Sequence, residues 1–331
     1  MKQTDRRSFL KIAASSVGIG VLYSAYPAAL SAGEAGGLFS ALGRANGEKP
    51  STFSFVQLSD AHVGFNGPPD PLGTKAFERA VEMINALPQR PDLVLFTGDL
   101  THDTEDRDVH VQRMKQFQEI SKRINVPLIK CVPGEHDAGL DSGGLYREFF
   151  GETHYSFDHR GVHFVALDNV TRAKPEVGTE QLDWLKKDLA RFPKTAPIVI
   201  FTHRPLFDLR PDWEWFTSDG DDVMNVLSAY DNVSVLYGHI HRDDEHQLGS
   251  VHHYAARSLI FAFPDPTGMG PRKPVPFDKE HPFKNLGIRT VSFNGKAQPE
   301  SSPLAIEDVE LTAREFQGIN GVHQFLRTPL V

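Results

Sequence analysis

The sequence predicts a layered α/β fold, and two patterns support that prediction. Short continuous apolar runs recur between residues 53 and 237, and such runs are typical of strands covered on both faces. Between them, apolar residues repeat at helical spacing, as in Phe77, Val81 and Ile84. Strands that alternate with helices in this way are the arrangement of layered α/β proteins.

Each element follows from its own stretch of sequence. We expect strands over residues 53–59, 92–97, 128–132, 198–202 and 233–237, and a hairpin formed by 155–157 and 162–167. We expect helices over residues 74–87, 106–123 and 180–191. Beyond residue 265, prolines interrupt the pattern, and only residues 287–293 indicate a further strand.

The composition narrows the class of protein. The chain has 331 residues, with 35 Lys and Arg against 43 Asp and Glu, so its formal net charge is -8. Such an acidic chain lacks the broad basic surface of non-specific nucleic-acid binders. Cys131 is the single cysteine, so no intrachain disulfide forms. We expect Cys131 to be a buried, unreactive thiol.

The first residues have the layout of an export signal. Arg6 and Arg7 precede a weakly apolar run from residue 12 to residue 30, followed by small residues. The sequence Arg-Arg-Ser-Phe-Leu-Lys is similar to a twin-arginine export signal. Gly and Ser make the run less apolar than a stable membrane span prefers, although a single membrane anchor is the alternative.

These patterns divide the chain into four parts. We expect a signal peptide over residues 1–32, a linker over 33–50, a main domain over 51–265, and a C-terminal extension over 266–331 that packs on the domain. The twin-arginine export machinery is then an expected partner. The expected location is the periplasm or the outside of the cell.

Five of the expected strands run into residues that commonly bind metals. These candidate ligands are Asp60, His62, Asp99, Glu135, His203, His239 and His241. In open α/β sheets, ligands bind beyond the carboxyl ends of the strands. Carboxylate oxygens and imidazole nitrogens suit Mn, Fe or Zn rather than Cu(I). Seven ligands exceed one tetrahedral ion but suit two divalent ions, which together hold a hydroxide for attack on a phosphate ester.

Local spacing adds two expectations about these candidate ligands. Asp60 and His62 lie two residues apart, so an extended segment would point both to one side, and the same holds for His239 and His241. The glycines that precede Asp99, Glu135 and His239 would permit tight turns directly after the strands.

The ordered motifs Asp-x-His, Gly-Asp, Gly-Glu-His-Asp, His and Gly-His-x-His resemble the calcineurin-like metallophosphoesterase superfamily. They look most like the branch that includes bacterial class III cyclic-nucleotide phosphodiesterases, and the resemblance covers residues 53 to about 242. It implies a four-layer α/β/β/α sandwich with mixed sheets.

The same resemblance implies a role for each motif residue. Asp60, His62 and His241 would hold the first metal, Asp99 would bridge, and Glu135, His203 and His239 would hold the second. His136 would be the acid that protonates the leaving oxygen, and Asp137 would orient it.

Glu135 departs from the family, which has Asn at this position. A carboxylate adds a negative charge and a longer side chain, so we expect tighter metal binding and slower or narrower hydrolysis. The alternative is that Glu135 points away from the site as a solvated carboxylate. For the neighbours, we expect His102 and Asp103 in a polar loop, although both would line the site mouth in the alternative. Arg204 would meet either a substrate phosphate or a surface carboxylate.

The predicted function is therefore metal-dependent hydrolysis of a small phosphate ester. A phosphodiester is preferred, because its single negative charge suits a site that Glu135 makes less positive. The alternatives are a phosphomonoesterase and an exported metal-binding protein with little hydrolytic activity. The sequence defines neither the substrate-binding residues nor the oligomeric state.

Overall fold

The computed structural model describes residues 51–268, 270–295 and 304–312. The expected signal peptide and linker lie outside these residues. The two sheets described below lie within them, and both contain parallel and antiparallel pairs.

The first sheet has five strands in the order β11-β10-β1-β2-β3. Its parallel part is β1 (Phe53–Leu58), β2 (Leu93–Thr97) and β3 (Ile129–Val132). The strands β10 (Gly287–Phe293) and β11 (Leu304–Glu310) continue it antiparallel beyond β1. The expected strand over 287–293 is confirmed, whereas the sequence did not indicate β11.

The second sheet has six strands in the order β4-β5-β6-β7-β9-β8. Its centre is parallel and comprises β5 (Val162–Ala166), β6 (Pro197–Phe201), β7 (Asn232–Tyr237) and β9 (Val251–Ala255). The strands β4 (Tyr155–His159) and β8 (Asp244–Leu248) form its antiparallel edges. Every residue of β5, β6 and β7 is buried, as the continuous apolar runs predicted.

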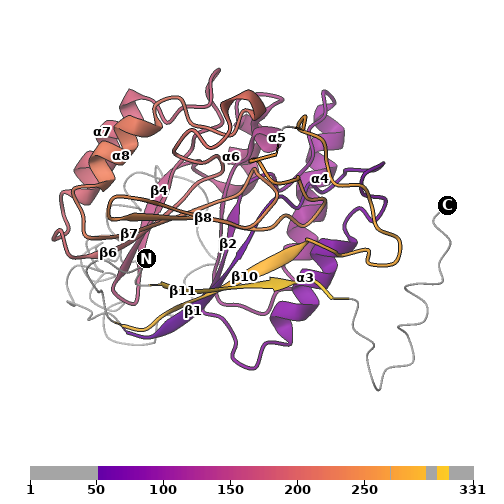
Figure 1. The fold of residues 1–331 in the computed structure, drawn as a ribbon, viewed down its shortest axis with the longest axis horizontal. Coiled ribbons are helices and arrows are strands. Elements are labelled where there is room, and N and C mark those ends of the chain that lie inside the picture. Colours follow the sequence, from indigo (N-terminus) through magenta and orange to yellow (C-terminus); the bar gives the residue numbers. More distant parts are fainter. Residues whose placement is uncertain (1–50, 269, 296–303, 313–331) are drawn as a thin grey trace, which may run out of the picture. The chain divides into compact units, whose positions relative to one another are not determined.

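The helices lie on the outer faces of the two sheets (Figure 1). Those against the first sheet are α3 (Lys75–Asn85), α4 (Arg107–Ser121) and α6 (Gly144–Phe150). Those against the second are α7 (Thr179–Leu189) and α8 (Gly220–Leu227). The helix α4 begins where the Asp106 side chain accepts from the amides of Asp108 and Val109, a typical N-cap. The short helices α5 (Glu135–Ala138) and η1 (Pro211–Trp213) lie in loops.

Three apolar clusters separate four layers. One joins the outer face of the first sheet to α3 and α4, for example through Val56, Phe77 and Phe117. A second fills the space between the sheets, where Phe55 meets Phe164. A third joins the second sheet to α7 and α8. The four-layer α/β/β/α sandwich with mixed sheets is thereby confirmed.

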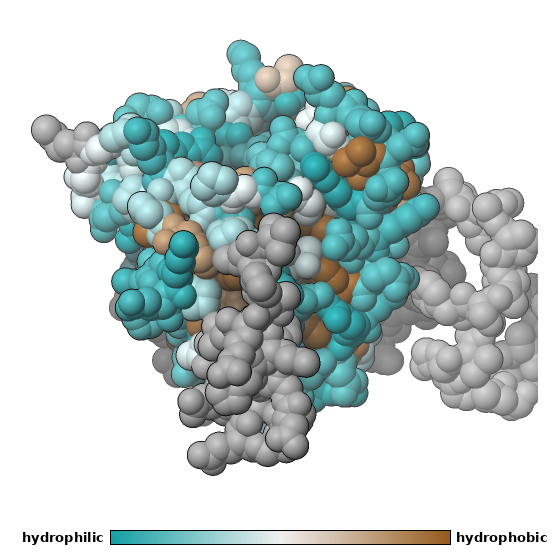
Figure 2. Space-filling view, turned by 90° about the vertical axis from the view of Figure 1, so that its right-hand side faces the viewer, coloured by the Kyte–Doolittle hydropathy of each residue, from teal (hydrophilic) through white to brown (hydrophobic). Residues whose placement is uncertain are grey.

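Outer surfaces of the helices are polar, as their amphipathic sequences require. The side of the molecule in Figure 2 is mostly hydrophilic where described residues cover it, and hydrophobic residues show in a few small areas. Among the described residues, no helix has the length and apolar character needed to cross a membrane. Cys131 is buried, as expected, and burial raises the pKa of its thiol.

Candidate metal centre

The backbone turns sharply at the ends of the strands that lead to the site. Asp60, His62, Asp99, His239 and His241 have φ angles of 53°, 40°, 47°, 66° and 53°. The expectation of an extended segment at both Asp-x-His and His-x-His is therefore wrong. Non-glycine residues with positive φ are uncommon and often lie at functional sites. Here each pair converges on the site because the chain turns rather than because it alternates.

The glycines that precede Asp99, Glu135 and His239 have two different roles. Gly98 has a φ of 95°, so a tight turn requires glycine there, as expected. Gly134 has a φ of -102°, which any residue adopts. A Cβ atom on Gly134 would lie 2.0 Å from Asp99 Oδ1, and one on Gly238 would lie 1.9 Å from Ser59 Oγ. These two glycines are required because neighbouring strand ends approach too closely for a side chain.

The first group of candidate ligands contains Asp60, His62, Asp99 and His241, all buried. His241 Nε2 lies 3.3 Å from Asp60 Oδ1 and 3.2 Å from His62 Nε2. His62 Nε2 lies 3.3 Å from Asp99 Oδ2. The facing atoms are those that bind metals in proteins.

The second group contains Glu135, His203 and His239. Glu135 Oε2 lies 2.7 Å from His203 Nε2, and Glu135 Oε1 lies 2.8 Å from His239 Nδ1. The Glu135 carboxylate thus faces the two imidazoles, and the alternative of a solvated carboxylate that points away is wrong.

Asp99 lies between the two groups. Its Oδ2 atom is 3.3 Å from His62 Nε2 in the first group and 3.5 Å from His203 Nε2 in the second. One carboxylate oxygen therefore lies within 3.5 Å of an imidazole nitrogen in each group.

Backbone carbonyls fix which imidazole nitrogens carry protons. His203 Nδ1 lies 2.7 Å from the Thr97 carbonyl oxygen, and His241 Nδ1 lies 2.8 Å from that of Phe261. His239 Nε2 lies 3.2 Å from the Glu214 carbonyl oxygen. A carbonyl only accepts, so these three nitrogens must donate. The opposite nitrogen of each neutral ring then presents a lone pair to the site.

The site consequently brings acceptors face to face in a buried space. His203 Nε2 and Glu135 Oε2 are both buried and lie 2.7 Å apart, and with a neutral His203 ring neither atom donates to the other. Burial alone would lower the pKa of His203, but the Asp99 and Glu135 carboxylates outweigh it and hold that pKa well above its usual value. The field at His203 therefore favours a positive charge, and the donor set fits divalent metal ions.

His136 lies beside the first group, with its ring held by Asp103. His136 Nδ1 lies 2.7 Å from Asp103 Oδ1, and Nε2 lies 3.9 Å from Asp99 Oδ2. Burial would lower the pKa of His136, but Asp99 and the hydrogen bond to Asp103 raise it to about 9. The protonated ring therefore presents an Nε2 proton donor toward the site.

Asp137 does not orient His136, which corrects that expectation. Its buried carboxylate accepts from the amides of Leu100, Thr101 and Gly134 at 2.8–2.9 Å. Asp137 therefore joins the loop after β2 to the loop after β3. The orienting contact to His136 comes from Asp103.

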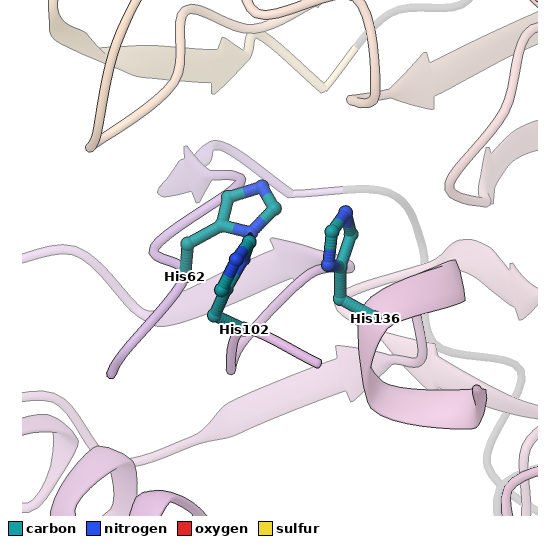
Figure 3. A group of neighbouring side chains, drawn as sticks. All are labelled: His62, His102 and His136. Carbon is teal, nitrogen blue, oxygen red and sulfur yellow. Dashed lines mark hydrogen bonds between the residues drawn. The ribbon is translucent and has the colours of Figure 1, made fainter. Parts of the chain in front are cut away.

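His102 and Asp103 lie at the site, so the expectation of a merely polar loop is wrong for both. Figure 3 shows the rings of His62, His102 and His136 grouped together. His102 Nδ1 lies 3.2 Å from His62 Nδ1, and its ring stacks on His136 with centroids 4.7 Å apart. Their position in the sequence could have indicated this, because they follow Asp99 by three and four residues in the loop after β2.

Arg204, Trp213 and Trp215 lie in the segment that follows β6. Arg204 Nη2 lies 3.5 Å from Glu135 Oε1, and its Nη1 donates to the Glu214 carbonyl oxygen. Trp213 and Trp215 are buried and pack edge to face. The tryptophans are therefore packing residues, and Arg204 borders the second group of candidate ligands.

Comparison with known proteins agrees with the family that the sequence motifs resemble. Residues 53–243 match the family described as calcineurin-like phosphoesterase. The chain is 29% identical over 204 residues to the probable glycerophosphodiester phosphodiesterase GpdQ of Arcobacter nitrofigilis, covering 56% of this chain and 71% of that protein. It is 23% identical over 220 residues to the 3',5'-cyclic-nucleotide phosphodiesterase alr5338 of Nostoc sp., covering 63% and 79%.

Solved structures share the fold. A dimetal phosphatase from Danio rerio superposes with a TM-score of 0.54 at 16% identity, covering 78% of this chain and 98% of that one. The purple acid phosphatase PPD1 from yellow lupin gives a TM-score of 0.56 at 16% identity, covering 80% and 52%. Since the family match spans more than half of the sequence, this chain belongs to the calcineurin-like phosphoesterase family.

Proposed function

We propose that this protein hydrolyses phosphate esters, with phosphodiesters preferred, at a centre of two divalent metal ions such as Mn, Fe or Zn. Asp60, His62 and His241 would hold one ion, and Glu135, His203 and His239 the other, with Asp99 shared. The observation that carries the proposal is the set of buried acceptors turned toward one another. The chemistry that such ions supply when bound is activation of water and neutralisation of phosphate charge.

His136 and Asp103 would handle the proton of the leaving group. Nε2 of His136 donates a proton to the departing alcohol oxygen, while Asp103 Oδ1 accepts the hydrogen bond from Nδ1 and fixes the ring. The hydrogen bond to the Asp103 carboxylate favours the protonated form of this ring.

Monoester hydrolysis is the second candidate function. The chain is 27% identical over 220 residues to a mouse protein named serine/threonine-protein phosphatase CPPED1, covering 58% of this chain and 70% of that one. A phosphomonoester carries more negative charge than a diester. The carboxylate of Glu135 therefore favours the diester.

The direct test compares two chromogenic substrates. The purified, Mn-loaded protein is assayed with bis(p-nitrophenyl) phosphate and with p-nitrophenyl phosphate, with and without EDTA. We expect chelator-sensitive hydrolysis with the higher kcat/KM for the diester. A higher kcat/KM for the monoester would select the second candidate. Bound metal without hydrolysis of either ester would contradict both esterase functions and support a metal-binding protein with little hydrolytic activity.

Asp103→Asn is expected to weaken proton donation without weakening substrate binding. We expect kcat to fall roughly tenfold for a diester with an alkyl leaving group, with KM nearly constant, because the negative charge that favours the protonated His136 ring is lost. The p-nitrophenyl ester should be affected less, because p-nitrophenolate leaves without a proton. Glu105→Gln, an exposed charge in the same loop, serves as the control. An equal loss with both leaving groups would show that Asp103 acts only on the fold.

Glu135→Asn is expected to raise the turnover of phosphodiesters. Removing a carboxylate makes the centre more positive, so we expect kcat to rise by up to roughly tenfold and metal affinity to fall. Glu135→Gln, which removes the charge but keeps the length, separates the two effects. The measurements are steady-state kinetics and metal competition with a chelator. A sharp fall in kcat for both variants would contradict this role for Glu135.

We also propose export through the twin-arginine pathway to the periplasm or beyond. The support is the Arg6-Arg7 pair and the apolar run that follows it. In a bacterial host with this pathway, Arg6→Lys/Arg7→Lys is expected to retain the protein in the cytoplasm, whereas Lys11→Arg should not. Cell fractionation measures the distribution, and carbonate-resistant membrane association would support the anchor instead.

A further inference from the structure

A cavity opens directly beside the second group of candidate ligands. Its volume is about 390 Å³, and Glu135 and Arg204 form part of its wall. Cavities that bind small molecules usually have about 300–1,000 Å³. This one is therefore large enough for a substituent of the ester whose phosphate lies at the metal centre.

Three loops that follow strands of both sheets line this open cavity. They contribute Ala138 and Ser142 around α5, residues 170–175 after β5, and Glu214 with Phe216 in the segment between β6 and α8. The cavity thus lies at the strand ends that carry the metal-ligand candidates, where α/β proteins bind ligands.

The β5–α7 loop brings two basic side chains to this cavity. Arg172 and Lys174 line it and are exposed. Arg172 has a loose contact of 3.7 Å with Glu180, whose side chain is 96% exposed. Lys174 has no ion pair with any described residue. Both charges are therefore available to an anion.

Acidic residues of the cavity are already engaged. The Glu135 carboxylate faces two imidazoles and Arg204. The Glu214 carboxylate lies 3.4 Å from Arg272, which belongs to another segment. Each acidic side chain of the cavity wall thus has a cationic partner within 3.5 Å, and Arg172 and Lys174 add two further positive charges there.

Buried polar contacts hold both ends of this loop in place. At its start, Asp168 accepts from the amides of Val170 and Thr171, and Gln181 bonds to both backbone groups of Asp168. At its end, Asp219 accepts from the amides of Val177 and Gly178.

The loop is also joined directly to Arg204. Asn169 Nδ2 donates to the Arg204 carbonyl, and the Arg204 amide donates to Asn169 Oδ1. The exposed Arg172 and Lys174 thus lie on a loop whose ends are held by hydrogen bonds. Such a loop is preorganised for binding, which lowers the entropic cost of holding a ligand.

We infer that this cavity binds a second anionic group of the substrate. The preferred substrates are then phosphate esters whose alcohol part carries a further carboxylate or phosphate, with Arg172 and Lys174 as the recognition residues. This inference rests on the proposed function for the position of the esterified phosphate, but the binding of the second anion does not require turnover.

Binding of two non-hydrolysable phosphonates tests the inference. Calorimetry compares phenylphosphonate with 4-carboxyphenylphosphonate on the Mn-loaded protein. We expect the carboxylated compound to bind roughly tenfold more tightly, as two partly exposed ion pairs allow. Arg172→Gln/Lys174→Gln should remove this preference. Lys115→Gln/Lys187→Gln, which removes two exposed charges from α4 and α7, should retain it.

Equal affinity of the native protein for both phosphonates would overturn the inference, as would an equal loss of preference in the control variant. Hydrolysis is measured separately with phenyl p-nitrophenyl phosphate and its 4-carboxyphenyl analogue. Retained phosphonate preference without hydrolysis of either diester would contradict the proposed function and support the anion subsite. Hydrolysis of both diesters without any phosphonate preference would contradict the subsite alone.

Discussion

Asp99→Asn is expected to abolish hydrolysis and to release both metal ions. Its Oδ2 atom lies within 3.5 Å of imidazoles in both groups, so both ions would lose a charged ligand. We expect kcat/KM to fall on the order of a thousandfold or more, since metal-ion catalysis supplies several kcal/mol of charge stabilisation. Elemental analysis and steady-state kinetics measure the two effects.

Asn suits this test because it keeps the size of Asp99 and an oxygen for the His136 amide, which now donates to Asp99 Oδ1 at 2.9 Å. The control is Asp183→Asn, an exposed carboxylate on α7. A variant that folds, binds two ions and hydrolyses diesters at the native rate would show that Asp99 does not bridge.

His136→Gln is expected to give the second largest loss, and one that depends on the leaving group. For a diester with an alkyl leaving group, we expect kcat to fall by about 10²–10⁴, the usual contribution of a general acid. For bis(p-nitrophenyl) phosphate we expect a much smaller fall, because p-nitrophenolate needs no proton. Kinetics with both substrates measure the difference.

The metal content separates this effect from loss of the centre. His136 lies 3.9 Å from Asp99 Oδ2 and is outside the two main ligand groups, so the variant should still bind two ions. An equal fall with both leaving groups, at full metal content, would contradict proton donation by His136.

Strands buried on both faces were predictable because their apolar runs are continuous. The five residues of β2 and the six of β7 are all buried, and such burial leaves little freedom for polar side chains. The strands β8 and β11 are largely exposed or half-buried and carry several charged residues. They are defined by pairing with β9 and β10, which local sequence does not reveal.

The members of the site were predictable, but several of their contacts were not. The seven candidate ligands could be identified from the sequence because Asp, Glu and His residues directly follow the predicted strands. At Asp60 and His62 the left-handed backbone accompanies hydrogen bonds from their amides to the carbonyl oxygens of Gly98 and Asp99 at the neighbouring strand end. Pattern alone favoured extended segments there.

The sequence also could not show whether Asp103 or Asp137 contacts the His136 ring. Both are acidic residues near His136 in the chain or in space, and adjacency in sequence favoured Asp137. The short helix α5 turns the Asp137 carboxylate toward the loop after β2 and leaves His136 Nδ1 facing Asp103. The path of the β2–α4 loop decides this pairing, and it depends on tertiary packing.

Anomalous diffraction from crystals of the Mn-loaded protein tests the dinuclear centre most directly. Two peaks are expected, one among Asp60, His62 and His241 and one among Glu135, His203 and His239, with the Asp99 carboxylate between them. A single peak, no peak, or peaks away from these seven side chains would contradict the dinuclear centre.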